Sequence, residues 1–285
     1  MKPQIVRIDL NDWVKTGEGS VGESFFHKND PTLMLKMNFI EAPADSWITE
    51  ITNSEAAHKL GLPVPKPGSI VFDGKRYGLM FQRIPDKVSY ARAVGDHPEN
   101  IPALAKDFAE VVRTLHATVC KVDDVRDIKD YNRENILKSR FHDEAFKAKA
   151  LKLVDSLPDG DTGVHGDLHF GNMIIGGGRT YIIDMDHFCY GYYKFDLAMF
   201  FVIIRMKDFA PEEYFKSIYH CTYDQAQQFL QCYMDSYSGK PVDLVALEEE
   251  LAPYIALRII SAENDIDTPY PDIPGFKACR YIDNL

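Results

Sequence analysis

The sequence predicts an α+β protein of two lobes, with a β-rich N-lobe over residues 1–84 and a mostly helical C-lobe over residues 85–285. Two observations support this class. Short strand-like runs separated by turn residues fill the first part, whereas apolar residues at helical spacing dominate from residue 100 onward. The boundary is placed at Ile84-Pro85-Asp86, because proline cannot continue a hydrogen-bonded strand.

The N-lobe elements follow from alternating apolar and polar residues between turn signals. Strands are expected over residues 5–10, 24–27, 32–37, 68–72 and 77–81. A helix is expected over residues 45–60, with Asp45 or Ser46 as its cap and Gly61 as its terminator. The turn Asp73-Gly74 joins the last two strands, so we expect a small antiparallel sheet with one helix.

The C-lobe helices follow from periodicity. Apolar residues recur at helical spacing over residues 101–115, 195–201 and 225–237. The histidine that follows the first of these, His116, is interpreted as a packed or capping group with no chemistry of its own.

Composition limits the class of protein. Residues 1–84 carry 10 Lys or Arg and 10 Asp or Glu, whereas residues 85–285 carry 22 and 33, so the net charge of −11 resides in the C-lobe. Such a surface repels nucleic acid and anionic membrane and attracts cationic small molecules, although solubility alone would also explain it. The absence of an apolar run of about 20 residues, or of a signal-peptide core, favours a cytoplasmic protein. Five scattered cysteines argue against a disulfide framework or zinc site.

A glycine-rich segment, Gly17-Glu18-Gly19-Ser20-Val21-Gly22, matches the spacing G-x-G-x-x-G shared by dinucleotide-binding folds and kinases. Strand-like residues follow it, whereas a dinucleotide-binding fold requires a helix there. We therefore interpret it as a hairpin whose N–H groups approach phosphates, with an ordinary glycine-rich turn as the alternative.

Lys36 is flanked by Met34, Leu35 and Met37, in a run that should be buried on at least one face. A buried ammonium requires partners. Nucleotide phosphates and a glutamate of the following helix, Glu50 or Glu55, are the candidates, and a surface lysine on an edge strand is the alternative.

The densest chemistry lies in His165-Gly166-Asp167-Leu168-His169-Phe170-Gly171-Asn172, followed by Ile182-Ile183-Asp184-Met185-Asp186. Phosphoryl transfer to a hydroxyl requires a carboxylate base and oxygen ligands for Mg²⁺. Asp167 supplies the base, and Asn172 and Asp184 supply the metal ligands, in the order and spacing of the protein-kinase H-R-D-x-x-x-x-N and D-F-G motifs. His165 and His169 are expected to hold the loop in shape by hydrogen bonding.

These motifs resemble those of the aminoglycoside phosphotransferase and choline kinase family. The resemblance extends to Gly191, to Asp196-Leu197-Ala198, whose aspartate supports the loop in that family, and to the turn Leu62-Pro63-Val64-Pro65. It covers roughly residues 15–205. Two positions depart from the family pattern: Tyr193 replaces a frequent proline, and Pro85 replaces the usual glycine after the hinge.

The resemblance implies a protein-kinase-like fold and the cofactors ATP and Mg²⁺. Asp167 would be the catalytic base, Asn172 and Asp184 would hold Mg²⁺, and Lys36 would contact the phosphates. The spacing from the Leu62–Pro65 turn in that family favours Glu50 over Glu55 as partner of the lysine. Adenine would bind the backbone of Phe81 and Arg83, and the nucleotide-contacting positions would be Gly17, Gly19, Ser20, Gly22, Lys36, Glu50, Phe81 and Arg83.

The sequence therefore predicts an ATP- and Mg²⁺-dependent phosphotransferase that acts on a hydroxyl of a small molecule. The acidic positions Glu263, Asp265, Asp267 and Asp272 favour an amine-bearing acceptor, and an aminoglycoside, choline or ethanolamine, an amino sugar and a hydroxy-amino acid all fit. The alternatives are a metallophosphatase, which the missing Asp-x-His and His-x-His motifs disfavour, and a degenerate kinase that only binds nucleotide. A protein kinase is disfavoured because no Phe-Gly follows Asp184 and no Ala-Pro-Glu segment is present. The oligomeric state is not predicted.

Overall fold

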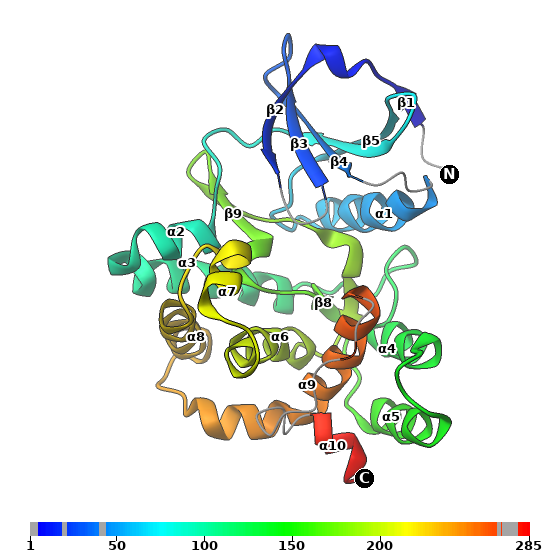
Figure 1. The fold of residues 1–285 in the computed structure, drawn as a ribbon, viewed down its shortest axis with the longest axis vertical. Helices are drawn as coiled ribbons and strands as arrows, with labels where there is room; N and C mark the ends of the chain where they lie inside the picture. Colours follow the sequence, from blue (N-terminus) through cyan, green and yellow to red (C-terminus); the bar gives the residue numbers. More distant parts are fainter. Residues whose placement is uncertain (1–4, 19–21, 40–43, 267–268, 270–278) are drawn as a thin grey trace. The chain divides into compact units, whose positions relative to one another are not determined.

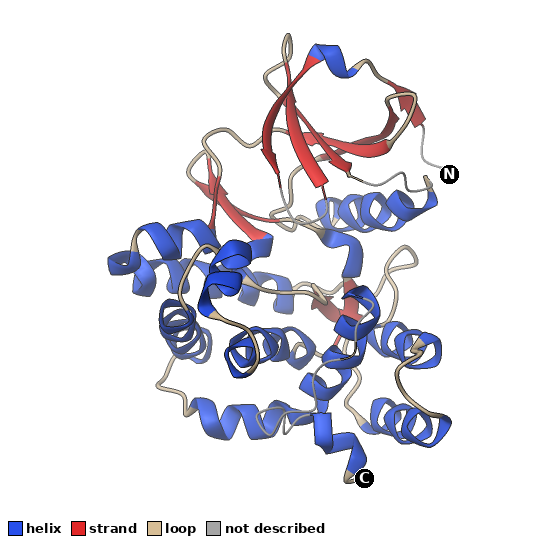
Figure 2. Ribbon diagram, in the orientation of Figure 1, coloured by secondary structure: helices blue, strands red, loops and turns tan. Residues whose placement is uncertain are grey.

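The computed structural model describes residues 5–18, 22–39, 44–266, 269 and 279–285. The chain forms two compact units (Figure 1). One contains Met1–Val88 together with Asn172–His187, and the other contains Ser89–Gly171 together with Phe188–Leu285. Strands dominate the first unit and helices the second (Figure 2), as expected for the α+β class. This division differs from the expected one, because residues 85–88 and 172–187 join the first unit rather than the second.

The first unit contains a six-stranded sheet in the order β1-β5-β6-β4-β3-β2. Its strands have the bounds β1 (Ile5–Arg7), β2 (Trp13–Glu18), β3 (Gly22–His27), β4 (Leu33–Asn38), β5 (Pro67–Phe72) and β6 (Tyr77–Gln82). The strands expected near residues 24–27, 32–37, 68–72 and 77–81 are confirmed.

Two expectations for the sheet were wrong. The run over residues 5–10 ends as a strand at Arg7 and continues into a short 3-10 helix, η1 (Leu10–Asp12), and β2 was not expected at all. The sheet is also not wholly antiparallel, because β1 pairs with β5 in parallel, with Ile5 opposite Ile70. Alternation of apolar residues identifies a strand but not the direction of its neighbour.

The two faces of the sheet bury different clusters. Leu35 and Met37 of β4 pack with Trp13, Phe25 and Val71 on one face. On the other face, helix α1 (Asp45–Lys59) packs its Trp47 and Ile51 against Ile70 and Leu79. Because successive side chains of a strand point to opposite faces, Lys36 lies on the α1 side of the sheet.

A hairpin completes the first unit. Strands β9 (Met173–Gly176) and β10 (Arg179–Ile182) pair antiparallel around Gly177 and Gly178, which both have positive φ. The peptide N–H of Ile182 donates to the carbonyl oxygen of Pro63 at 2.8 Å and ties the hairpin to the rest of the unit. The short 3-10 helix η4 (Met185–His187) follows the hairpin, and β7 (Val88–Ser89) lies where the chain passes from the first unit into the second.

The second unit is built from helices around an aromatic core. Its helices have the bounds α2 (Tyr90–Asp96), α3 (Ile101–Ala117), α4 (Ile128–Lys138), α5 (Glu144–Ser156), α6 (Lys194–Arg205), α7 (Glu212–Tyr219), α8 (Tyr223–Ser238), α9 (Leu244–Ile266) and α10 (Cys279–Asp283). Helix α3 packs against α8, and α6 packs against α9. The helices expected over residues 101–115, 195–201 and 225–237 are confirmed as parts of α3, α6 and α8.

The core of the second unit fixes the helices that pack against the loop over residues 165–172, the candidate catalytic loop. Phe108 of α3 lies 5.7 Å from Phe200 of α6 and 5.4 Å from Phe229 of α8, between ring centroids. Phe170 of the catalytic loop joins them, 5.6 Å from Phe200. A small sheet of β8 (Thr162–Val164) and β11 (Cys189–Gly191) flanks this core, and the short 3-10 helices are η2 (Pro98–Asn100), η3 (Phe170–Asn172) and η5 (Met206–Asp208). In the described part of the chain, no helix combines the length and apolar character needed to span a bilayer.

Candidate active site

Lys36 is the centre of an ion-pair cluster in the first unit. Its Nζ lies 3.0 Å from Oε1 and 3.3 Å from Oε2 of Glu50, and it also donates to Oδ1 of Asp184. Burial lowers the pKa of Lys36, but the carboxylates of Asp184 and Glu50 outweigh it, and the pKa lies above its ordinary value. Burial raises the pKa of Glu50 to about 7, and the carboxylates of Asp184 and Asp186 act in the same direction against the Lys36 ammonium. The ammonium of Lys36 and the carboxylates of Glu50 and Asp184 therefore meet at one point.

The expected choice of Glu50 over Glu55 is confirmed for the contact itself. Glu55 lies one turn further along α1, where it is half-exposed and its Oε2 is 3.9 Å from Nζ of Lys59. Glu50 is 6% exposed and lies on the buried face of the helix. The alternative of a surface lysine on an edge strand is excluded, because β4 lies between β6 and β3 and Lys36 is ion-paired on both sides.

A cavity of about 80 Å³, partly open to solvent, adjoins this cluster. Its floor is polar where Lys36, Glu50 and Asp184 line it. Its walls are apolar and include Val64, Phe81, Ile84, Ile174 and Ile183. An apolar lining beside a cationic group suits a purine base with attached phosphates.

Phe81 and Arg83 are placed differently with respect to this cavity. Phe81 lines it. The peptide N–H of Arg83 instead donates to the carbonyl oxygen of Thr32 at 2.7 Å, and its guanidinium lies 4.7 Å from the ring centroid of Phe26. A hydrogen bond from the backbone N–H of Arg83 to adenine would have to replace its bond to Thr32. Ile84, which lines the cavity, is therefore better placed than Arg83 to contact adenine.

The glycine-rich segment lies between β2 and β3. Gly17 is in β2 and Gly22 begins β3, whereas Gly19 and Ser20 lie outside the described residues. A Cβ at Gly22 would lie 2.3 Å from the carbonyl oxygen of Met37, so this glycine is required for the close approach of β3 to β4. Its packing role exists whether or not the segment contacts phosphates.

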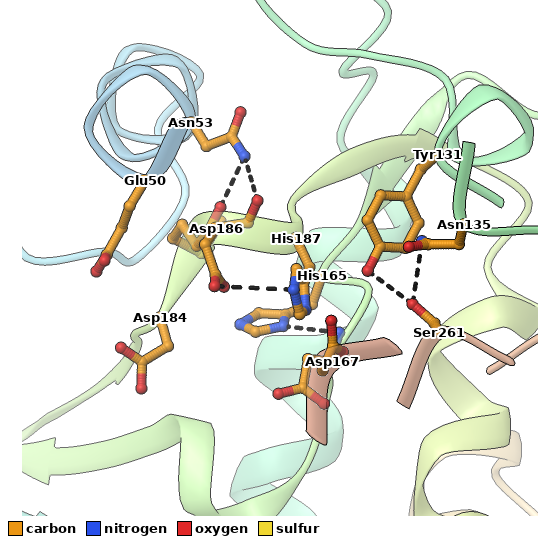
Figure 3. Close-up of polar contacts among 12 residues, drawn as sticks. Glu50, Asn53, Tyr131, Asn135, His165, Asp167, Asp184, Asp186, His187 and Ser261 are labelled. Carbon is orange, nitrogen blue, oxygen red and sulfur yellow. Dashed lines mark hydrogen bonds and ion pairs between the residues drawn. The ribbon is translucent and has the colours of Figure 1, made fainter. Parts of the chain in front are cut away.

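The loop that carries Asp184 is held by a residue that the sequence analysis missed. Asn53 of α1 donates from Nδ2 to the carbonyl oxygens of Met185 (2.8 Å) and Asp186 (3.1 Å), as Figure 3 shows. Asp184 has φ of 59°, a left-handed conformation that is costly for a residue with a side chain. The position of Asn53, three residues after Glu50, was the available signal, because residues three apart share a helix face.

Asn172 and Asp184 are brought together by the backbone. The peptide N–H of Ile183 donates to the carbonyl oxygen of Asn172 at 3.0 Å, so each residue lies beside one end of this bond. Asn172 is 7% exposed and the Asp184 side chain 39% exposed. One amide and one carboxylate oxygen donor suit Mg²⁺, which binds few protein ligands and completes its shell with phosphates and water.

In the second unit, Asp167 contacts a buried arginine that the sequence analysis did not single out. Nη2 of Arg258, on α9, donates to Oδ1 of Asp167 at 2.7 Å. Nε2 of His169 lies 3.7 Å from Oδ2 of the same carboxylate. Burial opposes the charge of Arg258, but Asp167 and Asp265 outweigh it and raise the pKa of the guanidinium above its ordinary value. No local spacing relates positions 167 and 258, so only the fold could reveal the pair.

The catalytic loop is shaped by its two histidines, as expected. Nδ1 of His165 accepts the N–H of Asp167 at 3.2 Å (Figure 3), and Nδ1 of His169 accepts the N–H of Gly171 at 2.9 Å. Gly166 has φ of 82°, a conformation that favours glycine. Both imidazoles therefore hold the backbone on either side of Leu168.

Asp196 anchors the start of this loop from α6. Its Oδ2 accepts the N–H of His165 at 2.7 Å, and its Oδ1 accepts the N–H of Gly166 at 2.8 Å. His116 of α3 lies with Nε2 3.1 Å from Oδ2 of Asp196 and Nδ1 2.9 Å from the Tyr237 hydroxyl. Asp196 is completely buried. His116 is a packed residue, as expected, but its packing partner is the carboxylate that supports the loop.

The acidic residues near the C-terminus are partly neutralised. Oε2 of Glu263 lies 2.7 Å from Nε2 of His142, and Oδ2 of Asp265 lies 3.3 Å from Nη1 of Arg258. Asp267 and Asp272 lie outside the described residues. The negative charge expected to attract an amine is therefore matched by cationic or titratable partners at both described positions.

The family assignment follows from comparison with known proteins. The model of the phosphotransferase enzyme family (APH) matches residues 19–228. The chain belongs to this family, which confirms the resemblance inferred from the motifs.

Curated relatives include methylthioribose kinases. That of Bacillus cereus (strain AH187) is 24% identical over 245 residues, which cover 78% of this chain and 56% of the kinase. That of Geobacillus sp. (strain WCH70) is 23% identical over 239 residues, which cover 78% of this chain and 55% of the kinase. The chain thus spans little more than half the length of these relatives.

Solved structures confirm the protein-kinase-like fold. The aminoglycoside phosphotransferase APH(4)-Ia, in a ternary complex with AMP-PNP and hygromycin B, matches with a TM-score of 0.61 at 17% identity, over 96% of this chain and 93% of that one. A choline/ethanolamine kinase family protein from Mesorhizobium loti matches with a TM-score of 0.55 at 14% identity, over 96% and 88%. At these identities the likeness concerns the fold alone.

Proposed function

We propose that this protein is an ATP- and Mg²⁺-dependent phosphotransferase that transfers the γ-phosphate to a hydroxyl of a small molecule. The observation that carries the proposal is the contact of Lys36 with both Glu50 and Asp184 beside an apolar cavity. An ammonium held by a helix carboxylate and a loop carboxylate is the arrangement that kinases use to place nucleotide phosphates. The membership in the phosphotransferase family supports the same reaction class and disfavours a metallophosphatase.

The residues divide the work between nucleotide and acceptor. The adenine ring of ATP would lie against Phe81 and Ile84, and Lys36 would neutralise phosphate charge. Asn172 and Asp184 would hold Mg²⁺, which would supply positive charge to neutralise the phosphates. The carboxylate of Asp167 would accept the proton of the acceptor hydroxyl as the oxygen attacks the γ-phosphorus, while the bond from that phosphorus to the bridging oxygen breaks and ADP leaves.

For the acceptor, the contacts favour a neutral polyhydroxy compound over an amine. Arg258 and His142 stand beside Asp265 and Glu263, so the electrostatic argument for a cationic acceptor is weaker in the structure than in the sequence. The similarity to methylthioribose kinases, over 78% of the chain, points in the same direction. We therefore propose a sugar hydroxyl as the acceptor group.

The proposal is tested with purified protein, ATP and MgCl₂ by coupled ADP release. The acceptor panel contains methylthioribose and ribose as neutral compounds, and hygromycin B, choline, ethanolamine and serine as amines. Turnover that depends on one acceptor supports a phosphotransferase. Binding of AMP-PNP without turnover of any acceptor or of water would identify a nucleotide-binding protein instead, and turnover of amines alone would overturn the neutral acceptor.

A further inference from the structure

The buried guanidinium of Arg258 contacts the candidate base, Asp167, directly. Its three nitrogen atoms have three different partners: Nη2 donates to Oδ1 of Asp167 (2.7 Å), Nη1 to Oδ2 of Asp265 (3.3 Å), and Nε to Sδ of Met199 (3.2 Å). The side chain is 9% exposed. A planar fork that is fixed at three points has little rotational freedom, so its position determines that of the carboxylate.

From this geometry we infer that Arg258 is a positioning residue for phosphoryl transfer, which holds one oxygen of Asp167 so that the other is presented to the acceptor hydroxyl. The inference rests on the proposed function. The guanidinium of Arg258 donates to Oδ1 of Asp167. The other oxygen, Oδ2, lies 3.7 Å from Nε2 of His169. A carboxylate held at one oxygen cannot turn its second oxygen away without breaking a charge-assisted bond.

Arg258 is a cation in direct hydrogen-bond contact with Asp167, and charged or titratable groups of two elements lie around this pair. The catalytic loop contributes His169 and His165, and the latter accepts the Asp167 N–H. Helix α9 contributes Arg258 and, behind it, Asp265. Helix α4 contributes Tyr131, which interacts electrostatically with Arg258 and whose hydroxyl lies 2.8 Å from Oγ of Ser261. Burial raises the pKa of Tyr131 to about 12, so this phenol stays neutral at physiological pH.

A purely structural role would account for an ion pair between Arg258 and a carboxylate, but not for the choice of Asp167 as that carboxylate. Helices α6 and α9 are already joined by Arg205 and Glu248, whose Nε–Oε1 and Nη2–Oε2 distances are both 2.6 Å. Arg258 also links α9 to α6, through Met199, but its carboxylate partner in the loop is the candidate base. Arg205 therefore provides a matched control for the loss of an arginine between the same two helices.

The test uses Arg258→Met, which keeps an unbranched apolar stem but removes the charge, with Arg258→Lys and Arg205→Met. The probe is ATP hydrolysis with water as acceptor, together with transfer to methylthioribose, each followed by ADP release. For Arg258→Met we expect kcat to fall about 10- to 100-fold, as for a displaced catalytic group. The KM for ATP should stay within two-fold, and the acidic limb of the kcat profile should move to higher pH, because a nearby cation favours the ionised carboxylate.

The other variants separate positioning from packing. Arg258→Lys keeps the charge and should restore the acidic limb with an intermediate kcat, and it remains informative if Arg258→Met does not fold. Arg205→Met should keep both kcat and the pH profile. A kcat for Arg258→Met within two-fold of wild type, or an equal loss in Arg205→Met, would overturn the inference. An absence of any ATP turnover in the wild-type protein would overturn the proposed function itself.

Discussion

The carboxylate of Asp196 and the peptide of His165 form a buried bond of 2.7 Å that fixes the start of the catalytic loop. Because Gly166 donates to the second oxygen of the same carboxylate, both acceptor positions face backbone donors. His116 adds a third contact from α3. The loop is therefore held from two helices of the second unit at a point two residues before Asp167.

Asp196→Asn should disrupt this support, because the carboxamide presents an N–H group to one of the two peptide donors. We expect the free energy of unfolding to fall by about 2–4 kcal/mol and kcat to fall more than 10-fold. Urea unfolding and ADP release measure the two effects. Asp235→Asn is the matched control, since Asp235 accepts the N–H of Val242 at 2.7 Å elsewhere in the unit. It should lose stability without a loss in kcat, and wild-type activity in Asp196→Asn would contradict the assignment.

Glu50→Gln should weaken nucleotide binding, because the neutral amide holds the Lys36 ammonium less firmly than the carboxylate does. We expect the Kd for AMP-PNP with Mg²⁺ to rise about 10-fold, which corresponds to about 1.4 kcal/mol. Isothermal titration calorimetry measures it. Glu55→Gln changes the same residue type on the same helix, where the partner is the exposed Lys59, and should leave the Kd unchanged. Equal effects of the two changes would refute the role of Glu50.

Asp167→Asn should remove the base while keeping the shape of the loop. Loss of a general base costs about 10²–10⁴-fold in rate, so kcat should fall by that range while the Kd for AMP-PNP changes little. Stopped-time ADP assays and calorimetry distinguish the two quantities. Asp159→Asn, which alters an exposed carboxylate paired with Lys129, serves as control. Turnover within a few-fold of wild type would exclude Asp167 as the base.

Asp184→Asn should weaken the dependence of nucleotide binding on magnesium. The amide is a poorer ligand than the carboxylate for a hard cation, so more MgCl₂ should be needed for the same occupancy by AMP-PNP. Titrations of nucleotide at several MgCl₂ concentrations, and in EDTA, measure the effect. The Kd for AMP-PNP should differ between wild type and variant in MgCl₂ and should be the same for both in EDTA. A difference of equal size in both conditions would place Asp184 outside the metal site.

The buried Glu50 should also make stability depend on pH. Its pKa lies at about 7 in the folded chain, above the ordinary value of 4.5, so the folded state binds the proton more tightly. The resulting stabilisation is complete below about pH 4.5 and is lost as the pH rises through 7. Relative to Glu50→Gln, the free energy of unfolding of the wild-type protein without nucleotide should therefore fall by up to about 3 kcal/mol between pH 5 and 8.

This pH effect is measurable by urea unfolding followed by tryptophan fluorescence. Both tryptophans, Trp13 and Trp47, are buried in the first unit, which also contains Glu50, so the signal reports on the relevant part. A difference between wild type and Glu50→Gln that stays constant from pH 5 to 8 would contradict the prediction.

The parts of the site that the sequence predicted are those encoded by local spacing. Asp167 and Asn172 are five residues apart, and the fold class followed from periodicity over runs of this length. The contact of Lys36 with Glu50 was also accessible, since a strand and the next helix contribute one residue each. The ion pair of Arg258 with Asp167 joins positions far apart in the chain, and no periodicity or motif carries that information. The parallel pairing of β1 with β5 was missed for the same reason.

The first unit draws residues 172–187 from far beyond its main segment, and this affects how the chain can assemble. During synthesis, residues 1–88 emerge well before Asp184 and the β9–β10 hairpin. In that interval Lys36 has only one of its two carboxylate partners, and Asn53 has no carbonyl groups of residues 185 and 186 to bind. The cavity beside Lys36 is thus completed late, so under the proposed function a truncated product that stops before residue 184 would bind ATP poorly.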